Sequence, residues 1–160
     1  MFLNGHPMIS HLRFLIPVML AGLLAACGGS STFEPVELRT SRIAALWPTT
    51  NMQETYVIRS DGEWLVAWQK HEPPTYPKTD RPQIDFSKNM VVGLSLGSGS
   101  NGCYRLSIQR VVEEEEEVRV EYIHSMAQAG SICTQAIVAL TDFVVVNKSE
   151  KRVTFSQIGS

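Results

Sequence analysis

"MVVGLSLGSGSNGCYRLSI", residues 90–108, contains the pattern that decides the fold. Residues 90–96 form a nearly continuous apolar run rich in β-branched side chains, which predicts a strand buried on both faces. After the glycines and serines, Tyr104, Leu106 and Ile108 alternate with polar residues and predict a second strand with one buried face. We therefore expect residues 97–104 to form an exposed loop between two strands.

Further segments with strand character follow the same rules. Val118, Val120 and Tyr122 alternate with charged residues, so this segment is expected to pair with the strand at 104–109 as a hairpin. The five glutamates of 113–117 lie between the two strands, and an exposed hairpin tip suits them because like charges repel and are costly to bury. A calcium site is the functional alternative, but the run lacks the spacing of a calcium loop.

Three more segments, 55–59, 142–148 and 152–158, are also predicted strands. The last two are joined by the short polar turn "KSE", and such a short connection predicts that they are antiparallel neighbours.

One helix is predicted at residues 61–71. Ser60 and Glu63 have the spacing of a capping box, and the "EPP" at 72–74 ends the helix. Trp64, Leu65 and Trp68 form an apolar stripe expected to face a core, although the two tryptophans could instead form a ligand-stacking surface. Together these elements predict an α+β, mainly β fold: an antiparallel sheet or a small sandwich with one packed helix.

The N-terminus has the form of an export signal. The apolar stretch at 14–26 suits a secretory signal and is short for a membrane span. It ends in "LLAAC", which closely resembles the lipobox of bacterial lipoproteins. The resemblance implies that Cys27 is acylated and anchors the mature protein in a membrane of the cell envelope. Gly28 stands where retention in the inner membrane calls for Asp, which implies the outer membrane, facing the periplasm; an ordinary signal peptide is the alternative.

The chain then divides into three parts: a lipoprotein signal peptide at 1–26, a lipidated cysteine with a flexible Gly/Ser-rich tether at 27–35, and a single mainly β domain at 36–160. The formal net charge of the chain is −2, and no basic stripe is present to hold nucleic acid. We expect no nucleic acid partner and no cofactor.

Two cysteines remain once Cys27 carries lipid. In an oxidising compartment, Cys103 and Cys133 are expected to form a disulfide, which would stabilise the domain by about 3 to 4 kcal/mol. A nucleophilic cysteine is the alternative, but it needs a base, and His71 and His124 are the histidines that follow the signal. Neither CxxC nor HxxxH spacing occurs, so no metal site is expected.

The glycine-rich loop is the candidate site. A phosphate cradle is excluded because the loop leads into a strand rather than a helix and lacks the GK[ST] sequence. A loop tied down by Cys103 loses little entropy on binding, so we expect it to contact a protein partner. The candidate contact residues are Gly97, Ser98, Gly99, Ser100, Asn101, Gly102 and Tyr104.

Residues 84–108, "IDFSKNMVVGLSLGSGSNGCYRLSI", resemble the C-terminal domain of the protease complex subunit PrcB, in which an Asp-Phe pair precedes a buried strand and a glycine-rich loop. The segments "EWLVAWQKH" and "AIVALTDFVVV" fall where that domain has a Trp-bearing helix and a terminal strand pair, so the resemblance covers about 55–155. At 101–104 the sequence Asn-Gly-Cys-Tyr replaces the usual Thr-Gly-Gly-Tyr. The resemblance implies a non-catalytic surface lipoprotein that binds or stabilises another exported protein, such as a protease.

Three functions therefore remain open. The first is a membrane-anchored module that binds an exported protein through 97–104 and the neighbouring hairpin tip. The second is an exported hydrolase that uses Cys103 or a serine with His124 and Asp142. The third is a structural envelope lipoprotein without a dedicated partner. The absence of a G-x-S-x-G motif and the scarcity of histidines favour a protein that is not an enzyme.

Overall fold

The computed structural model describes residues 33–43, 46–48, 50–74 and 78–159, so the predicted signal segment and the predicted lipidation site Cys27 lie outside the described residues. The chain divides into two units, 1–31 and 32–160, and the described residues belong to the second. Its elements in chain order are β1 (Val36–Leu38), β2 (Ser41–Arg42), β3 (Glu54–Ile58), α1 (Asp61–His71), β4 (Asn89–Gly99), β5 (Arg105–Glu113), β6 (Glu117–Ser125), β7 (Val138–Asn147) and β8 (Arg152–Gly159).

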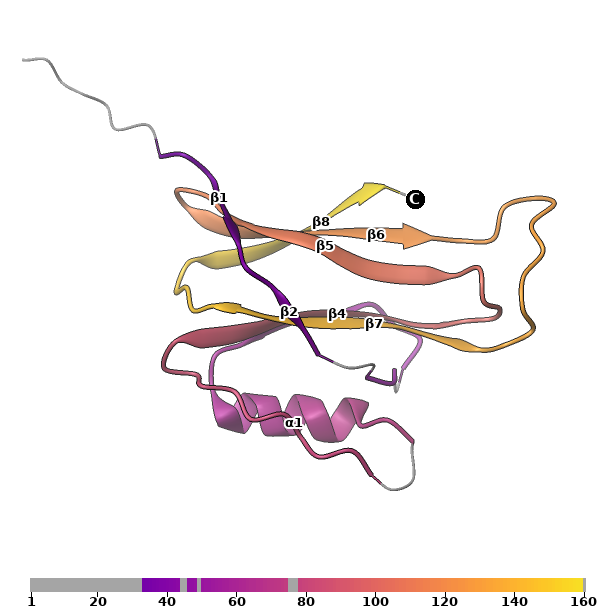
Figure 1. Ribbon diagram of the computed structural model, residues 1–160, viewed down its shortest axis with the longest axis horizontal. Helices are drawn as coiled ribbons and strands as arrows, with labels where there is room; N and C mark the ends of the chain where they lie inside the picture. The colour runs from indigo at the N-terminus through magenta and orange to yellow at the C-terminus, as the bar shows by residue number, and fades with distance from the viewer. Residues whose placement is uncertain (1–32, 44–45, 49, 75–77, 160) are drawn as a thin grey trace, which may run out of the picture. The chain divides into compact units, whose positions relative to one another are not determined.

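The strands form two sheets of four that lie face to face (Figure 1). The first sheet has the order β1-β5-β6-β8 and the second the order β2-β7-β4-β3. All neighbouring strands are antiparallel except β6 and β8, which are parallel. Helix α1 covers the outer face of the second sheet, which gives three layers. The predicted α+β, mainly β fold with one packed helix is confirmed.

The second sheet is buried on both faces. Because successive side chains of a strand point to opposite faces, Val92 and Val144 enter the layer between the sheets, whereas Val91 and Phe143 meet the helix. The Phe143 ring lies directly over Gly93, its neighbour on β4, and fills the space that a side chain would occupy there. The prediction that residues 90–96 form a strand buried on both faces is confirmed.

The helix begins and ends where the sequence predicts. The Ser60 hydroxyl accepts a hydrogen bond from the Glu63 amide at 3.3 Å, and the Glu63 carboxylate accepts from the Ser60 amide at 3.1 Å, so the capping box is formed. Trp64 and Trp68 are buried against the second sheet, which confirms their core role over ligand stacking. The placement of Leu65 in the apolar stripe is wrong: the side chain is 42% exposed, because Ala67 and His71 complete the buried face instead.

The glutamate run lies at the tip of the β5–β6 hairpin, as predicted, but its members differ in environment. Glu115 and Glu116 are exposed. The other three are partly buried, and each has a cationic partner: Glu113 with Lys151 at 3.3 Å, Glu114 with Arg119 at 2.5 Å and Glu117 with Arg152 at 2.7 Å. Ion pairs thus offset much of the repulsion that a run of like charges would otherwise create.

The prediction that the segments 142–148 and 152–158 are antiparallel neighbours is wrong. Strand β7 already has β2 on one edge and β4 on the other, so neither edge can accept β8. The short turn instead carries the chain from the second sheet to the first, where β8 pairs in parallel with β6. The guanidinium of Arg59 fixes this crossing by donating to the carbonyls of Ser149 and Lys151 at 2.9 and 2.8 Å.

An ion pair within the second sheet, between Arg42 and Asp142, also holds the first sheet through hydrogen bonds to Ile108 of β5. Strand β1 pairs only with residues 111–113 of β5, and the chain then passes to the second sheet as β2 (Figure 1). This leaves the backbone of Ile108 without a strand partner on that edge. The Asp142 carboxylate accepts from the Ile108 amide at 2.7 Å, and Arg42 donates to the Ile108 carbonyl at 3.0 Å while it also pairs with Asp142. Side chains of the second sheet therefore replace a missing strand of the first.

Replacing Asp142 with Ala is expected to lower the free energy of unfolding by about 1 to 3 kcal/mol, because the buried amide of Ile108 loses its acceptor. Asp142→Asn keeps an acceptor oxygen of the same reach and is expected to lose less. Urea unfolding of both variants, followed by circular dichroism, measures the difference. An Asp142→Ala protein as stable as the wild type would contradict this role.

Candidate functional site

A disulfide ties together two connections at one end of the sandwich. Cys103 follows β4 and Cys133 lies in the connection from β6 to β7, and the bond between them, with Cα atoms 5.4 Å apart, confirms the predicted pairing. The amide of Gly102 also donates to the carbonyl of Thr134 at 2.9 Å. A side chain at Gly102 would lie against the Thr134 hydroxyl, so Thr134 would have to move if Gly102 were replaced.

The loop that follows β4 begins later than residue 97, where the sequence predicts its start. Strand β4 continues to Gly99 because Ser98 and Gly99 pair with residues 138–139 of β7 after an irregularity in the register. Gly97 has a φ of +86° and lies against the backbone of Asn51, which leaves no room for a side chain. The interpretation of 97–99 as an exposed loop is therefore wrong, since Gly97 and Gly99 are buried strand residues.

The remaining candidates form a tight turn. The side-chain oxygen of Asn101 accepts from the Cys103 amide at 3.0 Å, and its carbonyl accepts from the Tyr104 amide at 3.3 Å. Tyr104 is half-buried and packs against the layer between the sheets, so its ring contributes mainly to the core. Of the seven candidate residues, Ser98, Ser100 and Gly102 are the exposed ones.

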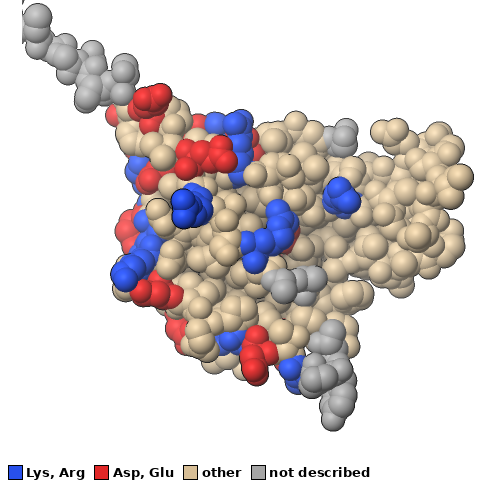
Figure 2. Space-filling view, viewed as in Figure 1, with Lys and Arg blue, Asp and Glu red and all other residues tan. Residues whose placement is uncertain are grey.

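The disulfide brings these residues beside a surface that the sequence analysis did not single out. Met126, Ile132 and Ile137 all project from the β6–β7 connection into solvent, and Ile132, next to Cys133, is fully exposed. No Asp, Glu, Lys or Arg occurs in 95–104 or 125–141, and we call these two segments together the uncharged end. Figure 2 shows this end without charged residues on the face in view. The absence of charge over seventeen residues around Cys133 was the signal that could have located it.

The residues of the hydrolase alternative do not come together. The Cys103 sulfur is bonded to Cys133, and the Asp142 carboxylate is held by Arg42 and the Ile108 amide. Burial raises the pKa of Asp142. The Nε2 atom of His124 is buried without a hydrogen-bond partner, so no nucleophile is paired with it in the described part of the chain.

Within the described ranges, no group of three or more His, Cys, Asp and Glu side chains could hold a metal ion. The same residues include no helix of sufficient length and apolar character to span a membrane.

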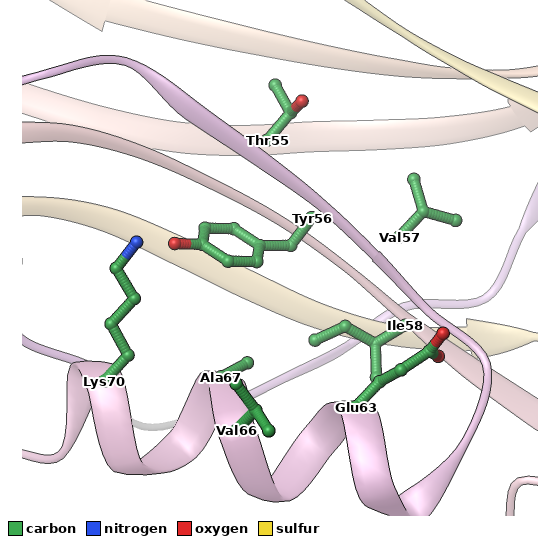
Figure 3. A pocket seen from close by; sticks show the side chains of 8 residues that line it. All are labelled: Thr55, Tyr56, Val57, Ile58, Glu63, Val66, Ala67 and Lys70. Atoms are coloured by element: carbon green, nitrogen blue, oxygen red, sulfur yellow. The ribbon is translucent and has the colours of Figure 1, made fainter.

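A groove that contains none of the predicted contact residues forms a second candidate site. It has a volume of about 460 Å³ and lies between β3 and α1 (Figure 3). Its lining consists of consecutive strand residues and one face of the helix: Thr55, Tyr56, Val57, Ile58, Glu63, Val66, Ala67 and Lys70. The helical positions 63, 66, 67 and 70 have the i, i+3, i+4, i+7 spacing of a single helix face, which is the signal that could have pointed to it.

A polar network closes one end of this groove. The Tyr56 hydroxyl lies 2.6 Å from a Glu54 carboxylate oxygen and 2.7 Å from Nε2 of His71, and Lys70 donates to Glu54 at 2.6 Å. Nδ1 of His71 donates to the carbonyl of Trp47 at 2.9 Å. Burial raises the pKa of Tyr56 to about 12 and lowers the pKa of the fully buried His71. This network joins β3 to the helix and contains no activated nucleophile.

The network predicts that stability depends on pH through His71. Burial holds the pKa of His71 in the folded state below its usual 6.5. Once the pH falls below that value, the unfolded state therefore binds more protons than the folded state. The free energy of unfolding is therefore expected to decrease between pH 7.5 and 5.5. Urea titrations across this range should show a smaller decrease for His71→Gln than for the wild type. An unchanged slope in His71→Gln would assign the dependence to other groups.

Comparison with known proteins gave no matching family model, no similar curated sequence and no similar solved structure. The described unit is a two-sheet β structure with a covering helix, one disulfide-stapled uncharged end and one open groove.

Proposed function

We propose that the protein is a non-catalytic, lipid-anchored protein of the cell envelope that binds or stabilises another exported protein through its uncharged end. An exported protease is the partner suggested by the resemblance to PrcB. The observation that carries the proposal is the exposure of Met126, Ile132 and Ile137 on a surface that the disulfide holds in place.

The chemistry of this end suits protein binding. Three exposed apolar side chains in one connection offer a contact surface, because covering apolar area with a partner is favourable by roughly 25 cal/mol per Å². The absence of nearby charges lowers the desolvation cost of association. Because the disulfide already restricts both connections, less conformational entropy is lost on binding.

The chain enters the domain away from the uncharged end, which leaves that end free of the tether attachment. The tether joins the domain at Val36, which pairs with Glu113 at the glutamate tip of the β5–β6 hairpin. Strand β5 runs from this tip to Arg105, next to the uncharged end. The chain that precedes Val36 therefore joins the domain at the end opposite Cys103 and Cys133.

Lipidation at Cys27 is the first test of this proposal. Metabolic labelling with a palmitate analogue is expected to label the full chain, and Cys27→Ser is expected to abolish the label because the lipobox cysteine is the acylated residue. Full labelling of the Cys27→Ser protein would contradict the anchor.

Partner binding is tested by changing the uncharged end alone. An Ile132→Asp, Ile137→Asp double variant buries two charges in any apolar interface at this end and should reduce partner recovery at least tenfold. The measurement is affinity purification of the cross-linked full chain from membranes, quantified by mass spectrometry. Leu65→Asp is the matched control, since it also places an acid at an exposed apolar position, but on the helix.

Equal recovery of the same protein with the wild type and the double variant would place binding on another surface. Hydrolytic activity of the purified protein that is lost in His124→Ala would replace the binding proposal with the hydrolase alternative.

A further inference from the structure

The β6–β7 connection holds one short segment between two fixed points. Residues 128–131 form a β-turn closed by a hydrogen bond of 3.0 Å from the last amide to the first carbonyl, and Gly130 supplies the positive φ of +86° in this turn. On the other side, Cys133 is tied by the disulfide and the Thr134 carbonyl accepts a backbone hydrogen bond. Residues 131–134, which we call the held segment, are thus fixed at both ends.

Between these fixed points, Ile132 projects alone into solvent. Its side chain is 102% exposed, so no neighbouring group shields it from water. The held segment belongs to no helix or strand, and no described residue accepts a hydrogen bond from the amide of Ile132 or Cys133. The segment therefore offers a partner one aliphatic side chain and two unpaired main-chain donors.

This combination fits the way in which the cleft of a peptidase recognises a peptide. A pocket of the cleft takes one side chain, and main-chain groups of the cleft pair with the backbone on either side of it. A flexible peptide loses conformational freedom when it enters a cleft, and a segment that is already fixed at both ends loses less. The absence of Asp, Glu, Lys and Arg from 125–141 also means that no charge has to be desolvated beside an apolar pocket.

We propose that the held segment occupies the substrate cleft of an exported peptidase, with Ile132 in an apolar specificity pocket, and so competes with the substrates of that peptidase. This inference rests on the function proposed above, because it names the surface of the partner that the uncharged end covers. It goes beyond that function because it assigns the contact to one side chain and predicts an effect on peptide cleavage.

The surroundings of the Ile132 carbonyl favour occupation of the cleft over cleavage. A peptidase cleaves a bond whose carbonyl oxygen enters its oxyanion hole. The carbonyl oxygen of Ile132 lies 3.9 Å from the sulfur of Cys103, and the next residue, Cys133, is bonded to that sulfur. The disulfide therefore restrains the carbonyl from turning into an oxyanion hole, and we expect the bond between Ile132 and Cys133 to stay intact in the complex.

The first test is competition for peptide cleavage. Envelope membranes from cells that lack this chain are solubilised in detergent, and cleavage of a fluorogenic peptide with Ile before the scissile bond is measured with and without the purified full chain. We expect the added chain to raise the apparent KM for this peptide at least threefold and to leave Vmax unchanged. A lower Vmax at constant KM, or no cleavage that the chain suppresses, would overturn the proposal.

Matched variants assign the competition to Ile132. Ile132→Asp is expected to abolish it, whereas Ile132→Val should retain it because an aliphatic side chain still fills the pocket. Ile137→Asp is the control, since Ile137 is exposed on the same connection but lies outside the held segment. Circular dichroism establishes that each variant is folded. Competition by Ile132→Asp equal to that of the wild type would overturn the proposal.

A second pair of variants tests whether the fixed geometry contributes. A side chain at Gly130 would meet no atom within 4 Å, so a substitution there acts through the positive φ alone. Asn tolerates this backbone conformation, whereas a β-branched residue does not. We expect Gly130→Val to compete at least fivefold more weakly than Gly130→Asn. Equal competition by the two variants would contradict a role for the turn in presenting Ile132.

Partner recovery separates this inference from the function proposed above. If the uncharged end captures an exported protein that is no peptidase, or a peptidase whose cleavage of the peptide is unaffected, the cleft proposal fails while the binding function stands. If this end captures no protein at all, both fail. Mass spectrometry of the recovered chain should show an intact bond after Ile132, and rapid cleavage there would make the held segment a substrate and overturn the proposal.

Discussion

The burial of the second sheet on both faces is the constraint on which the rest of the structure depends. Strands β4 and β7 supply one row of side chains to the layer between the sheets and another to the layer under α1. Every residue from Met90 to Leu94 is therefore buried, including Gly93, whose open face is covered by Phe143. At nearly any of these positions a polar side chain would lose its contact with water and gain no hydrogen-bond partner. Exposed polar or apolar residues can therefore vary only at the ends of the strands.

The consequences appear at the two ends of the sandwich. At one end a hairpin of five glutamates is neutralised in part by Lys151, Arg119 and Arg152. At the other end the connections carry no charge and are joined by the Cys103–Cys133 bond. The described unit thus separates a charged end, beside β1, from an uncharged end with exposed apolar side chains. The groove beside α1 adds a third surface on the flank of the second sheet.

Local patterns in the sequence predict much of this fold, because they act over short distances. The capping box at Ser60, the alternation on either side of the glutamates and the apolar run at 90–96 each specify an element without reference to the rest of the chain. The partner of β8 could not be predicted in this way, since it depends on whether the edges of β7 are already occupied. The exposed Ile132 and Ile137 were missed for a related reason: their role follows from the position of the disulfide in space. No local sequence pattern predicts the hydrogen bond between Asp142 of the second sheet and the Ile108 amide of the first sheet.

The central claim is that the second sheet is buried on both faces, whereas the connections at the uncharged end are exposed to solvent. Hydrogen–deuterium exchange of the full chain tests this claim most directly. The account predicts that amides of β4 and β7 exchange last, and that amides of the β6–β7 connection between Met126 and Ile137 exchange far sooner, except beside the disulfide. Protection of that connection equal to β4 in the isolated protein, or rapid exchange in β4 and β7, would contradict it.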